Sequence, residues 1–255
     1  MKSIIEDFKT HVKNVKIETG NTRHCGKEGH WLEKKMGVKP NQKNEPDIEG
    51  YEMKKHSKGK ITLGDYSASE YAFSKHGKRN RLNDINHWTD DDIMSRHQFI
   101  KMFGSQNPLK HNRYSWSGSC VPKYNEWNDF GQTIDIQNDD IHIIYSRCKD
   151  TRTHDKEILN MLNQEQVVIA LWTKAKMKAC IERKFNNKGF FICKKQGDSY
   201  NKICFGKCFT FEHFISQFRT NKIIFDSGMY MGNNRNYSLF RGNQDFWESL
   251  IIEEY

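Results

Sequence analysis

The sequence of 255 residues has no long uninterrupted run of apolar residues. A helix that crosses a membrane needs about 18 or more such residues, so a membrane-spanning protein is excluded. The first segment, MKSIIEDFKTHVKNVK, lacks the apolar centre and the small-residue cleavage site of a signal peptide. It is instead typical of an amphipathic helix. We therefore expect a cytoplasmic protein with no membrane contact.

The sequence also lacks an even complement of cysteines. Seven Cys cannot all pair with one another, and without an export signal we expect reduced thiols. Cys204 and Cys208, with Cys193 and His213 nearby in sequence, raise the alternative of a zinc site. Their spacing fits no common zinc finger, and the segment KICFGKCFTFEHF is typical of a strand and turn. We favour inward-facing thiols over a zinc site.

No internal repeat, low-complexity tract or linker rich in Pro, Gly and Ser divides the chain. Sixteen Phe and six Trp argue against disorder. Helices are predicted over 1–16, 27–37, 154–164, 210–221 and 243–255, and strands over 51–56, 60–66, 131–148 as a hairpin, 167–176, 189–195, 222–230 and 236–242. The polar stretch 67–112 shows little periodicity. This irregular mixture predicts an α/β (α+β) fold with a mixed sheet.

Acidic residues are fewer than basic ones. Lys and Arg total 41 against 32 Asp and Glu, a formal net charge of +9. Such a surplus favours a polyanionic partner, most often nucleic acid. The alternative is an ordinary basic protein.

The segment NEPDIEGYEMKKH contains the candidate catalytic and metal-binding residues. Glu52 and Lys54 are two apart, so on a strand both point to one face. Asp47 precedes a Glu49-Gly50 turn, which can bring its carboxylate beside Glu52. Two carboxylates, with the carbonyl of Met53 as a third oxygen, form a hard site of the kind that Mg²⁺ prefers. A nearby lysine can orient the attacking water in phosphodiester hydrolysis.

An acid-x-Lys pair is weak evidence when it stands alone. The chain also has Asp7-x-Lys9, Glu33-x-Lys35 and Glu182-x-Lys184, and the alternative is a solvated charged strand. Pro46, the tight turn and the alternating strand raise the odds of a metal-dependent nuclease. Glu33, on a predicted helix beside Trp31 and Leu32, adds an acid upstream.

The segment GKEGHWLEKKMGVKPNQKNEPDIEGYEMKKHS resembles the catalytic signature of PD-(D/E)-x-K nucleases of the MutH/MvaI/BcnI/Sau3AI group. In that group a G-x-x-x-LE helix is followed by PD and then by E-x-K on a strand. The resemblance implies that Asp47 and Glu52, with the Met53 carbonyl, hold the metal. Lys54 would serve the water, and Glu33 would complete the acidic cluster. The order of later elements is also similar, although their motifs are less sharp.

The resemblance implies a restriction-endonuclease-like mixed β-sheet flanked by helices, with two lobes that form a DNA cleft. We expect a single nuclease domain over 1–255. Its catalytic lobe would be 1–75 plus 130–185, and its DNA-recognition lobe 76–129 plus 186–255.

The implied function is a type II restriction endonuclease that uses Mg²⁺, with Mn²⁺ able to substitute. It would cut double-stranded DNA at a specific site and leave 5′-phosphate ends. It would be a monomer, encoded by a prokaryote, phage or plasmid beside a cognate DNA methyltransferase. The alternatives are a MutH-like mismatch-repair nickase and a non-catalytic DNA-binding protein. An RNA-directed nuclease ranks lower, because no RNA-binding signature is present.

Several polar side chains are candidates for DNA contact. Arg can read guanine and Asn can read adenine through paired hydrogen bonds. The candidate residues are Lys55, His56, Arg113, Asn234, Arg235, Asn236, Tyr237 and Arg241. Lys55 and His56 follow the catalytic strand and are candidates for phosphate contact. The segment GNNRNYSLFR is the candidate for base reading, but it is also typical of an ordinary turn whose arginines touch only phosphates. Trp116 is expected in the core.

Overall fold

The computed structural model describes residues 1–18, 26–38, 44–73, 81–87, 94–152 and 165–255. Its contacts group the chain into two compact units. Unit 1 comprises Met1–Ile61, Lys178–Ser216 and Gly242–Tyr255, and unit 2 comprises Thr62–Met177 and Gln217–Arg241. The chain therefore passes between the units more than once, and each unit is assembled from segments distant in sequence.

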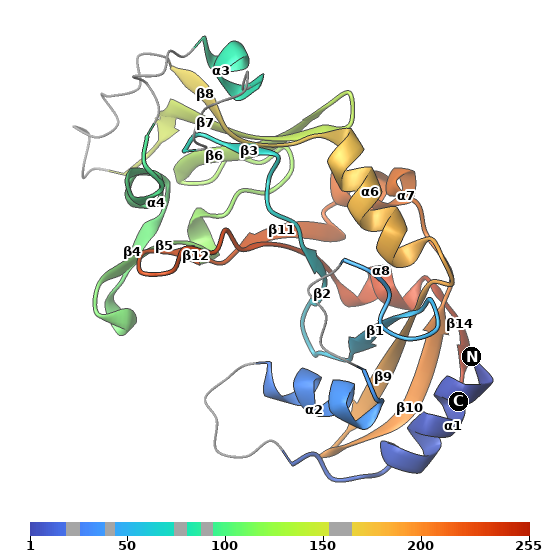
Figure 1. Cartoon of the computed structure of the whole chain (residues 1–255). Coiled ribbons are helices and arrows are strands. Elements are labelled where there is room, and N and C mark those ends of the chain that lie inside the picture. Colours follow the sequence, from blue (N-terminus) through green and yellow to red (C-terminus); the bar gives the residue numbers. More distant parts are fainter. Residues whose placement is uncertain (19–25, 39–43, 74–80, 88–93, 153–164) are drawn as a thin grey trace. The chain divides into compact units, whose positions relative to one another are not determined.

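The sheet of unit 1 has four strands in the order β1-β9-β10-β14 (Figure 1). These are β1 Glu52–Lys55, β9 Phe190–Gln196, β10 Ser199–Gly206 and β14 Ile251–Glu254. β1 runs parallel to β9, whereas the other neighbours are antiparallel. β1 is an edge strand, so one side of its backbone is open to other groups.

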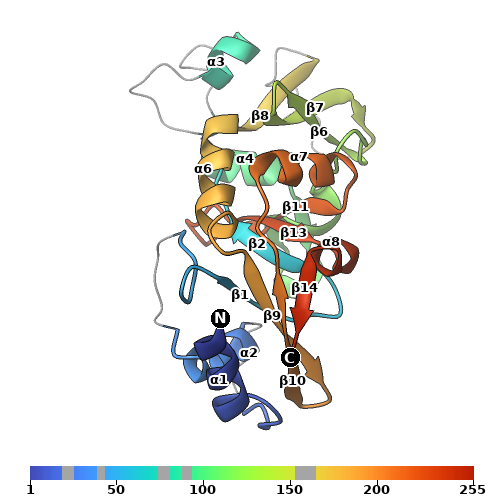
Figure 2. The same ribbon diagram turned by 90° about the vertical axis from the view of Figure 1, so that its right-hand side faces the viewer.

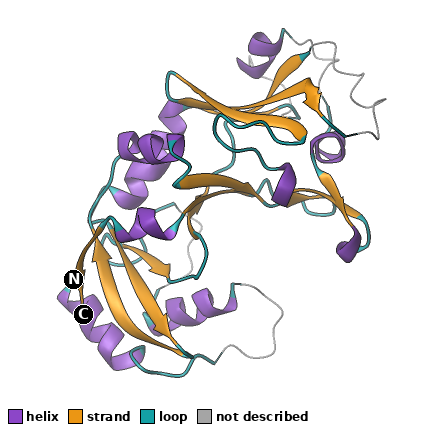
Figure 3. Ribbon diagram, turned by 180° about the vertical axis from the view of Figure 1, so that it is seen from behind, coloured by secondary structure: helices purple, strands orange, loops and turns teal. Residues whose placement is uncertain are grey.

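Helices α1 (Lys2–His11) and α2 (Lys27–Lys35) cover one face of this sheet (Figure 2). In Figure 3 the strands of this sheet, coloured orange, lie side by side, with the purple helices next to them. In α1 the apolar residues Ile4 and Phe8 are four apart, so they fall on one face, and both are buried. They pack with Leu32 of α2 against Met53 and Phe191 of the sheet. The apolar packing therefore fixes β1 from one side.

Three further helices are α6 (Lys174–Phe185), α7 (Phe211–Arg219) and α8 (Gln244–Glu248). In α6, Met177, Ile181 and Phe185 recur every four residues and are fully buried. α8 begins at Asn243, whose side chain accepts a hydrogen bond from the Phe246 N–H. None of the described helices has the length and apolarity needed to cross a bilayer.

Unit 2 contains three small sheets, in the orders β3-β8-β7-β6, β11-β13-β2 and β12-β5-β4. Their strands are β2 Ile61–Asp65, β3 Glu70–Tyr71, β4 Ser105–Asn107, β5 Arg113–Trp116, β6 Phe130–Gln137, β7 Asp140–Asp150, β8 Gln166–Trp172, β11 Ile223–Ser227, β12 Met229–Tyr230 and β13 Ser238–Gly242. Its helices are α3 Arg81–Asn86 and α4 Arg96–Phe103, with 3-10 turns η2 Pro108–Lys110 and η3 Gly118–Cys120. Trp116 and Trp172 are fully buried in its aromatic core. The prediction for Trp116 is confirmed.

Most predicted strands and helices are present, including the β6–β7 hairpin, but the closing helix over 243–255 is wrong. The segment forms only the short α8, and Ile251–Glu254 then pairs with β10 as an antiparallel strand. Backbone pairing along the exposed edge of β10 outweighs the helical pattern of the apolar residues. The predicted helix over 154–164 lies outside the described residues.

Three of the described helices are not predicted from the sequence: α3 and α4, which lie within the stretch 67–112, and α6. The stretch 67–112 contains α4, which begins with a capping box between Ser95 and Gln98. Its residues Phe99, Ile100 and Phe103 are fully buried. Residues 174–176, taken as the end of a strand, instead begin α6.

The two units also differ in their boundaries from the expected lobes. The β6–β7 hairpin pairs with β8 and belongs to unit 2, not to the part that holds Asp47. Conversely, β9, β10 and β14 join β1 in one sheet, so they belong with Asp47. Strand pairing, which the sequence does not display, decides both assignments.

Candidate active site

Asp47 and Glu52 are brought together by a two-residue turn. The backbone N–H of Tyr51 donates to the Ile48 carbonyl at 2.8 Å, and the Ile48 N–H donates to the Tyr51 carbonyl at 3.0 Å. Between them, Glu49 and Gly50 both have positive φ, 49° and 85°. This combination is that of tight hairpin turns, which require Gly or a tolerant residue. A Cβ at Gly50 would also lie 2.8 Å from the Asn187 side-chain nitrogen.

The turn places the Asp47 carboxylate against the open edge of β1. Its Oδ2 accepts a hydrogen bond from the Met53 backbone N–H at 2.9 Å. The N–H of Glu52 donates to the carbonyl of Gly189, the residue before β9, and the N–H of His56 donates to the Cys193 carbonyl of β9. In a strand, the N–H and C=O of one residue point to the same side and alternate along the chain. The Met53 carbonyl therefore faces the same edge as Asp47.

Glu52 is a buried carboxylate between two lysines. Its side chain is only 3% exposed. Lys54 Nζ donates to Glu52 Oε1 at 2.6 Å, and Lys184 Nζ of α6 lies 2.9 Å from the same oxygen. The other oxygen, Oε2, is buried and has no hydrogen-bond partner among the described residues. A buried polar atom without a partner is unfavourable, so Oε2 is placed to accept a ligand.

The electrostatics of the site follow from burial and from the closeness of the two acids. Burial raises the pKa of Asp47 to about 6, and the Glu52 carboxylate adds to the rise, while the Met53 N–H acts against it. Burial likewise lowers the pKa of Lys54, although Glu52 opposes this effect. Lys54 also lies over the Phe185 ring, 5.6 Å from its centroid. The site thus holds charged groups in surroundings poor in water.

Glu33 does not join this pair. It lies half-buried on α2. Among the residues that the structure describes, no group of three or more His, Cys, Asp or Glu side chains lies close enough to hold a metal ion. The two carboxylates and the Met53 carbonyl are therefore the oxygen donors brought together, and the proposed place of Glu33 in the acidic cluster is not seen. The same finding gives no support to a zinc site at Cys204 and Cys208.

Lys55 and His56 line a basic cavity of about 410 Å³ at the end of β1. Its remaining lining residues are Glu28, Ser57, Lys58, Lys195 and Gly197. Glu28 pairs with Lys195 at 3.0 Å and with Lys55 at 3.5 Å. Three lysines around one half-exposed acid leave an excess of positive charge beside the catalytic strand.

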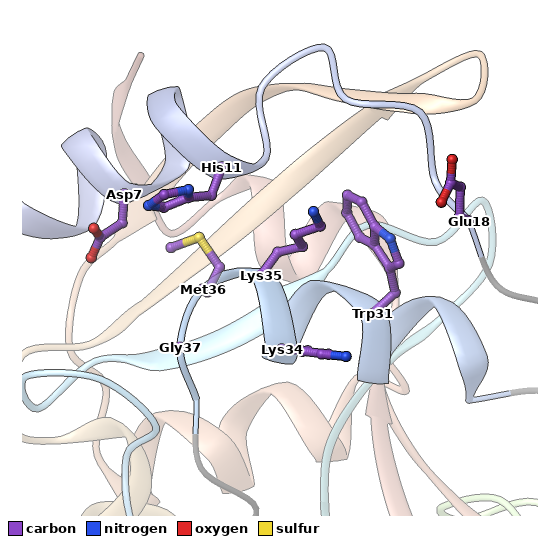
Figure 4. Close-up of a pocket in the computed structure, with 8 residues that line it drawn as sticks. All are labelled: Asp7, His11, Glu18, Trp31, Lys34, Lys35, Met36 and Gly37. Atoms are coloured by element: carbon purple, nitrogen blue, oxygen red, sulfur yellow. The ribbon is translucent and has the colours of Figure 1, made fainter.

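A larger cavity, of about 620 Å³, lies between α1 and α2 (Figure 4). Figure 4 shows His11 of α1 and Trp31 and Lys35 of α2 around it. It has lining residues of both charges, and none of the predicted catalytic residues line it. The larger cavity is therefore not part of the candidate active site.

In unit 2, the segment between β12 and β13 carries most of the predicted base-reading residues. Arg96 of α4 holds this segment. Its Nε donates to Asn236 Oδ1 at 2.7 Å, and one of its terminal nitrogens donates to the Arg235 carbonyl at 2.9 Å. Asp65 accepts from Arg235 at 3.0 Å and from the Ser238 N–H at 2.7 Å. We call residues 231–237 the recognition segment.

The side chains of three arginine candidates are also engaged. Arg235 stacks on Tyr237, and Arg113 stacks on Tyr230 with its guanidinium carbon 3.7 Å from the ring centroid. Arg241 forms an ion pair with Asp226 at 2.7 Å. Asn234 is exposed.

The sequence interpretation missed Lys184, Lys195 and Arg96. In the sequence, Lys184 stands out only as part of the Glu182-x-Lys184 pair. The apolar spacing of α6 marks a helix, but no local pattern relates that helix to Glu52. Lys195 reaches Glu28 in the basic cavity, and Arg96 reaches the recognition segment, through tertiary contacts alone.

Comparison with known proteins gives one consistent result. A family model described as LlaMI restriction endonuclease matches residues 9–255. The chain is 40% identical to the type II restriction enzyme ScrFI of Lactococcus lactis subsp. cremoris over 268 residues, covering 98% of this chain and 96% of the relative. The solved complex of restriction endonuclease MvaI with its cognate DNA substrate aligns with a TM-score of 0.63. That alignment covers all of this chain and 95% of MvaI at 12% identity, so it supports the mixed α+β fold.

Proposed function

Because this chain belongs to the LlaMI restriction endonuclease family, we infer that it is a type II site-specific deoxyribonuclease. We propose that it hydrolyses both strands of double-stranded DNA with Mg²⁺, and that Mn²⁺ can replace Mg²⁺. The product ends would be a 5′-phosphate and a 3′-hydroxyl. The observation that carries the proposal is the pairing of Asp47 and Glu52 across one tight turn, with Lys54 beside them.

The donor atoms suit a hard divalent cation. Asp47 offers a carboxylate oxygen, Glu52 offers the buried Oε2 that has no hydrogen-bond partner among the described residues, and Met53 offers its carbonyl. Oxygen donors of this kind are those that Mg²⁺ binds in phosphoryl-transfer sites. When bound, the ion would polarise the phosphoryl oxygen and lower the pKa of water. The ionised carboxylates of Asp47 and Glu52 would hold this ion.

Lys54 supplies the donor for the reacting groups. Its ammonium donates to Glu52 Oε1 and packs over Phe185, which keeps it beside the two carboxylates. From this position it can orient the attacking water and balance charge that develops on the phosphate. Attack of the water oxygen at phosphorus breaks the bond to O3′, which leaves the phosphate on the 5′ end.

The two units are assigned different tasks in this proposal. Unit 1 carries the hydrolytic site, and Lys55 and His56 contact phosphates beside it through the basic cavity. Unit 2 carries the recognition segment and Arg113, which read the bases or position the duplex. Glu33 remains a candidate for the acidic cluster in the complex with metal and DNA.

The cellular setting follows from this activity. A bacterial restriction enzyme acts in the cytoplasm, and the host must protect its own sites with a cognate DNA methyltransferase. We propose that the enzyme works as a monomer.

Digestion of plasmid DNA by the pure protein tests the function. Discrete double-strand fragments with Mg²⁺, and no other protein, are expected. Cutting of one strand only, or cutting that waits for a repair partner, would favour a mismatch-repair nickase. Asp47→Ala should abolish cutting and spare DNA binding, whereas Glu49→Ala in the same turn should cut normally. A wild type that binds DNA and never cuts with Mg²⁺ or Mn²⁺ would contradict the proposal.

A further inference from the structure

Glu52 has one cation more than the acid-x-Lys motif supplies. Lys54 reaches Glu52 Oε1 from the same strand, and Lys184 reaches it from α6, more than 130 residues later in the chain. The side chains of Lys54 and Lys184 are 11% and 16% exposed. Surface lysines rarely hold one geometry, because their side chains lose entropy when they do. Two largely buried ammonium groups on one oxygen therefore call for a reason.

The backbone around Lys184 is tied to the turn that carries Asp47. The Asn44 side chain donates to the Cys180 carbonyl of α6 at 2.9 Å. After the helix, the Lys188 N–H donates to the Gly50 carbonyl at 3.2 Å, and the Glu52 N–H donates to the Gly189 carbonyl at 3.1 Å. The end of α6 is thus fixed against both sides of the turn. Lys184 approaches Glu52 from a rigid frame.

The arrangement separates the two oxygens of Glu52. Both cations lie on Oε1, whereas Oε2 is left without a hydrogen-bond partner among the described residues. If Lys54 were alone, moving its ammonium toward a water or a phosphate would leave a buried carboxylate without a cation on that side. Uncompensated buried charges are strongly unfavourable. With Lys184 in place, Lys54 can leave Oε1 while Glu52 stays paired.

We propose that Lys184 is a positioning residue that keeps Glu52 Oε1 paired and thereby releases the Lys54 ammonium for the reacting water and phosphate. This inference rests on the proposed nuclease function. Lys184 itself touches neither DNA nor the reacting atoms. Its loss would lock Lys54 onto Glu52 and slow the chemical step, without weakening the hold of Asp47 and Glu52 on a cation.

The test compares Lys184→Met, Lys184→Arg and the matched control Arg183→Met, an exposed cation on the same turn of α6. Under single-turnover conditions with saturating DNA, Lys184→Met should cut about 10- to 100-fold more slowly. Lys184→Arg should recover most of the rate, and Arg183→Met should match the wild type. Affinity for DNA in Ca²⁺ should stay within about twofold, because Lys184 does not contact DNA. Lys184→Met should fold, since Lys54 still pairs with Glu52.

Calorimetric titration with Mn²⁺ in the absence of DNA gives the second readout. Removing a cation should leave Mn²⁺ affinity equal or tighter, and excess metal should not restore the rate of Lys184→Met. Weaker Mn²⁺ binding, with a rate restored by excess metal, would mean that Lys184 only shapes the metal site and would overturn the inference. So would an unchanged rate in Lys184→Met. A wild type that never cuts would instead refute the nuclease function itself, and the inference with it.

Discussion

The edge of β1 that carries Asp47, Glu52 and Lys54, here called the catalytic edge, and the recognition segment of unit 2 hold charge in opposite ways. At the catalytic edge, Glu52 is almost fully buried between two lysines, and one of its oxygens lacks a hydrogen-bond partner among the described residues. In the recognition segment, Arg235 is 64% exposed and already bonded to Asp65. Bond breaking benefits from charges fixed in advance in a dry site. Sequence reading instead uses groups that can exchange a weak partner for a base or a phosphate.

The largest effect should come from Glu52→Gln, which tests the fixed charges of the catalytic edge. The amide keeps the shape but loses the charge that would hold the ion and balance both lysines. Cutting should fall by about 10³-fold or more, roughly 4 kcal/mol of transition-state stabilisation. The measurement is the single-turnover rate on plasmid DNA with Mg²⁺.

The exposed Glu248, which pairs with Lys194 in the same unit, provides the control. Glu248→Gln should cut at the wild-type rate. Glu52→Gln leaves two buried cations unpaired, so its thermal stability must be measured beside its rate. If the Glu52→Gln protein is folded and its cutting rate lies within tenfold of the wild-type rate, Glu52 is not a catalytic residue.

Arg96→Ala should give the next largest effect, because this arginine holds the recognition segment from α4. Losing its hydrogen bonds frees Asn236 and the Arg235 carbonyl, so the segment loses its fixed shape. We expect cutting of the cognate site to fall about 30-fold, since each kcal/mol of lost orientation acts directly on the rate. The arrangement of Asp47, Glu52 and Lys54 in unit 1 should be unchanged in this variant.

The cutting rate of Arg96→Ala should also be measured on DNA sites altered at one base. Discrimination against these sites should shrink together with cognate cutting. Lys101→Ala, an exposed lysine of the same helix, serves as the control and should leave both unchanged. Equal loss on all DNA sequences would show that Arg96 supports folding or general binding rather than reading.

The local arrangement of Asp47, Glu52 and Lys54 is predicted from the sequence better than the rest of the fold, because the information that specifies it is local. Asp47, Glu52 and Lys54 lie within eight residues, and Glu49-Gly50 specifies the turn that joins them. Lys184 and Arg96 could not be found this way, since each reaches its partner only after distant strands pair. Similarly, β14 was mistaken for a helix because its pairing with β10 is not visible in the local pattern.

The pH dependence of cutting should follow Asp47 at limiting Mg²⁺. With a pKa of about 6, Asp47 is mostly ionised at pH 7 and mostly protonated at pH 5. A protonated carboxyl does not bind a divalent ion, so the rate should fall about tenfold between these pH values. Saturating Mg²⁺ should recover most of the loss. A rate insensitive to pH at limiting Mg²⁺ would mean that Asp47 does not hold the ion.

The same group has a signature in the stability of the metal-free protein. Its pKa is raised on folding from 3.8 to about 6, so the folded state binds the proton more tightly than the unfolded chain. The contribution of Asp47 to stability is therefore greatest at low pH and is lost as the pH rises through about 4 to 6. Asp47→Asn should remove this part of the pH dependence of unfolding by urea.

Arg235→Ala should have the smallest effect and bears most directly on how the recognition segment differs from the catalytic edge. Its bond to Asp65 lies at the surface, where such pairs contribute about 0 to 1 kcal/mol, so DNA can displace it easily. If the guanidinium then reads a base, cognate cutting should fall about fivefold and preference at one position should relax. A phosphate contact would instead weaken binding to all sequences alike and lower the salt slope of binding by about one.

For Arg235→Ala we expect relaxed preference at one base position, because Arg96 holds the Arg235 backbone by its carbonyl while the side chain stays exposed. Measuring both the salt slope and the cutting of altered sites separates the two, and the exposed Asn234→Ala provides the matched comparison in the same segment.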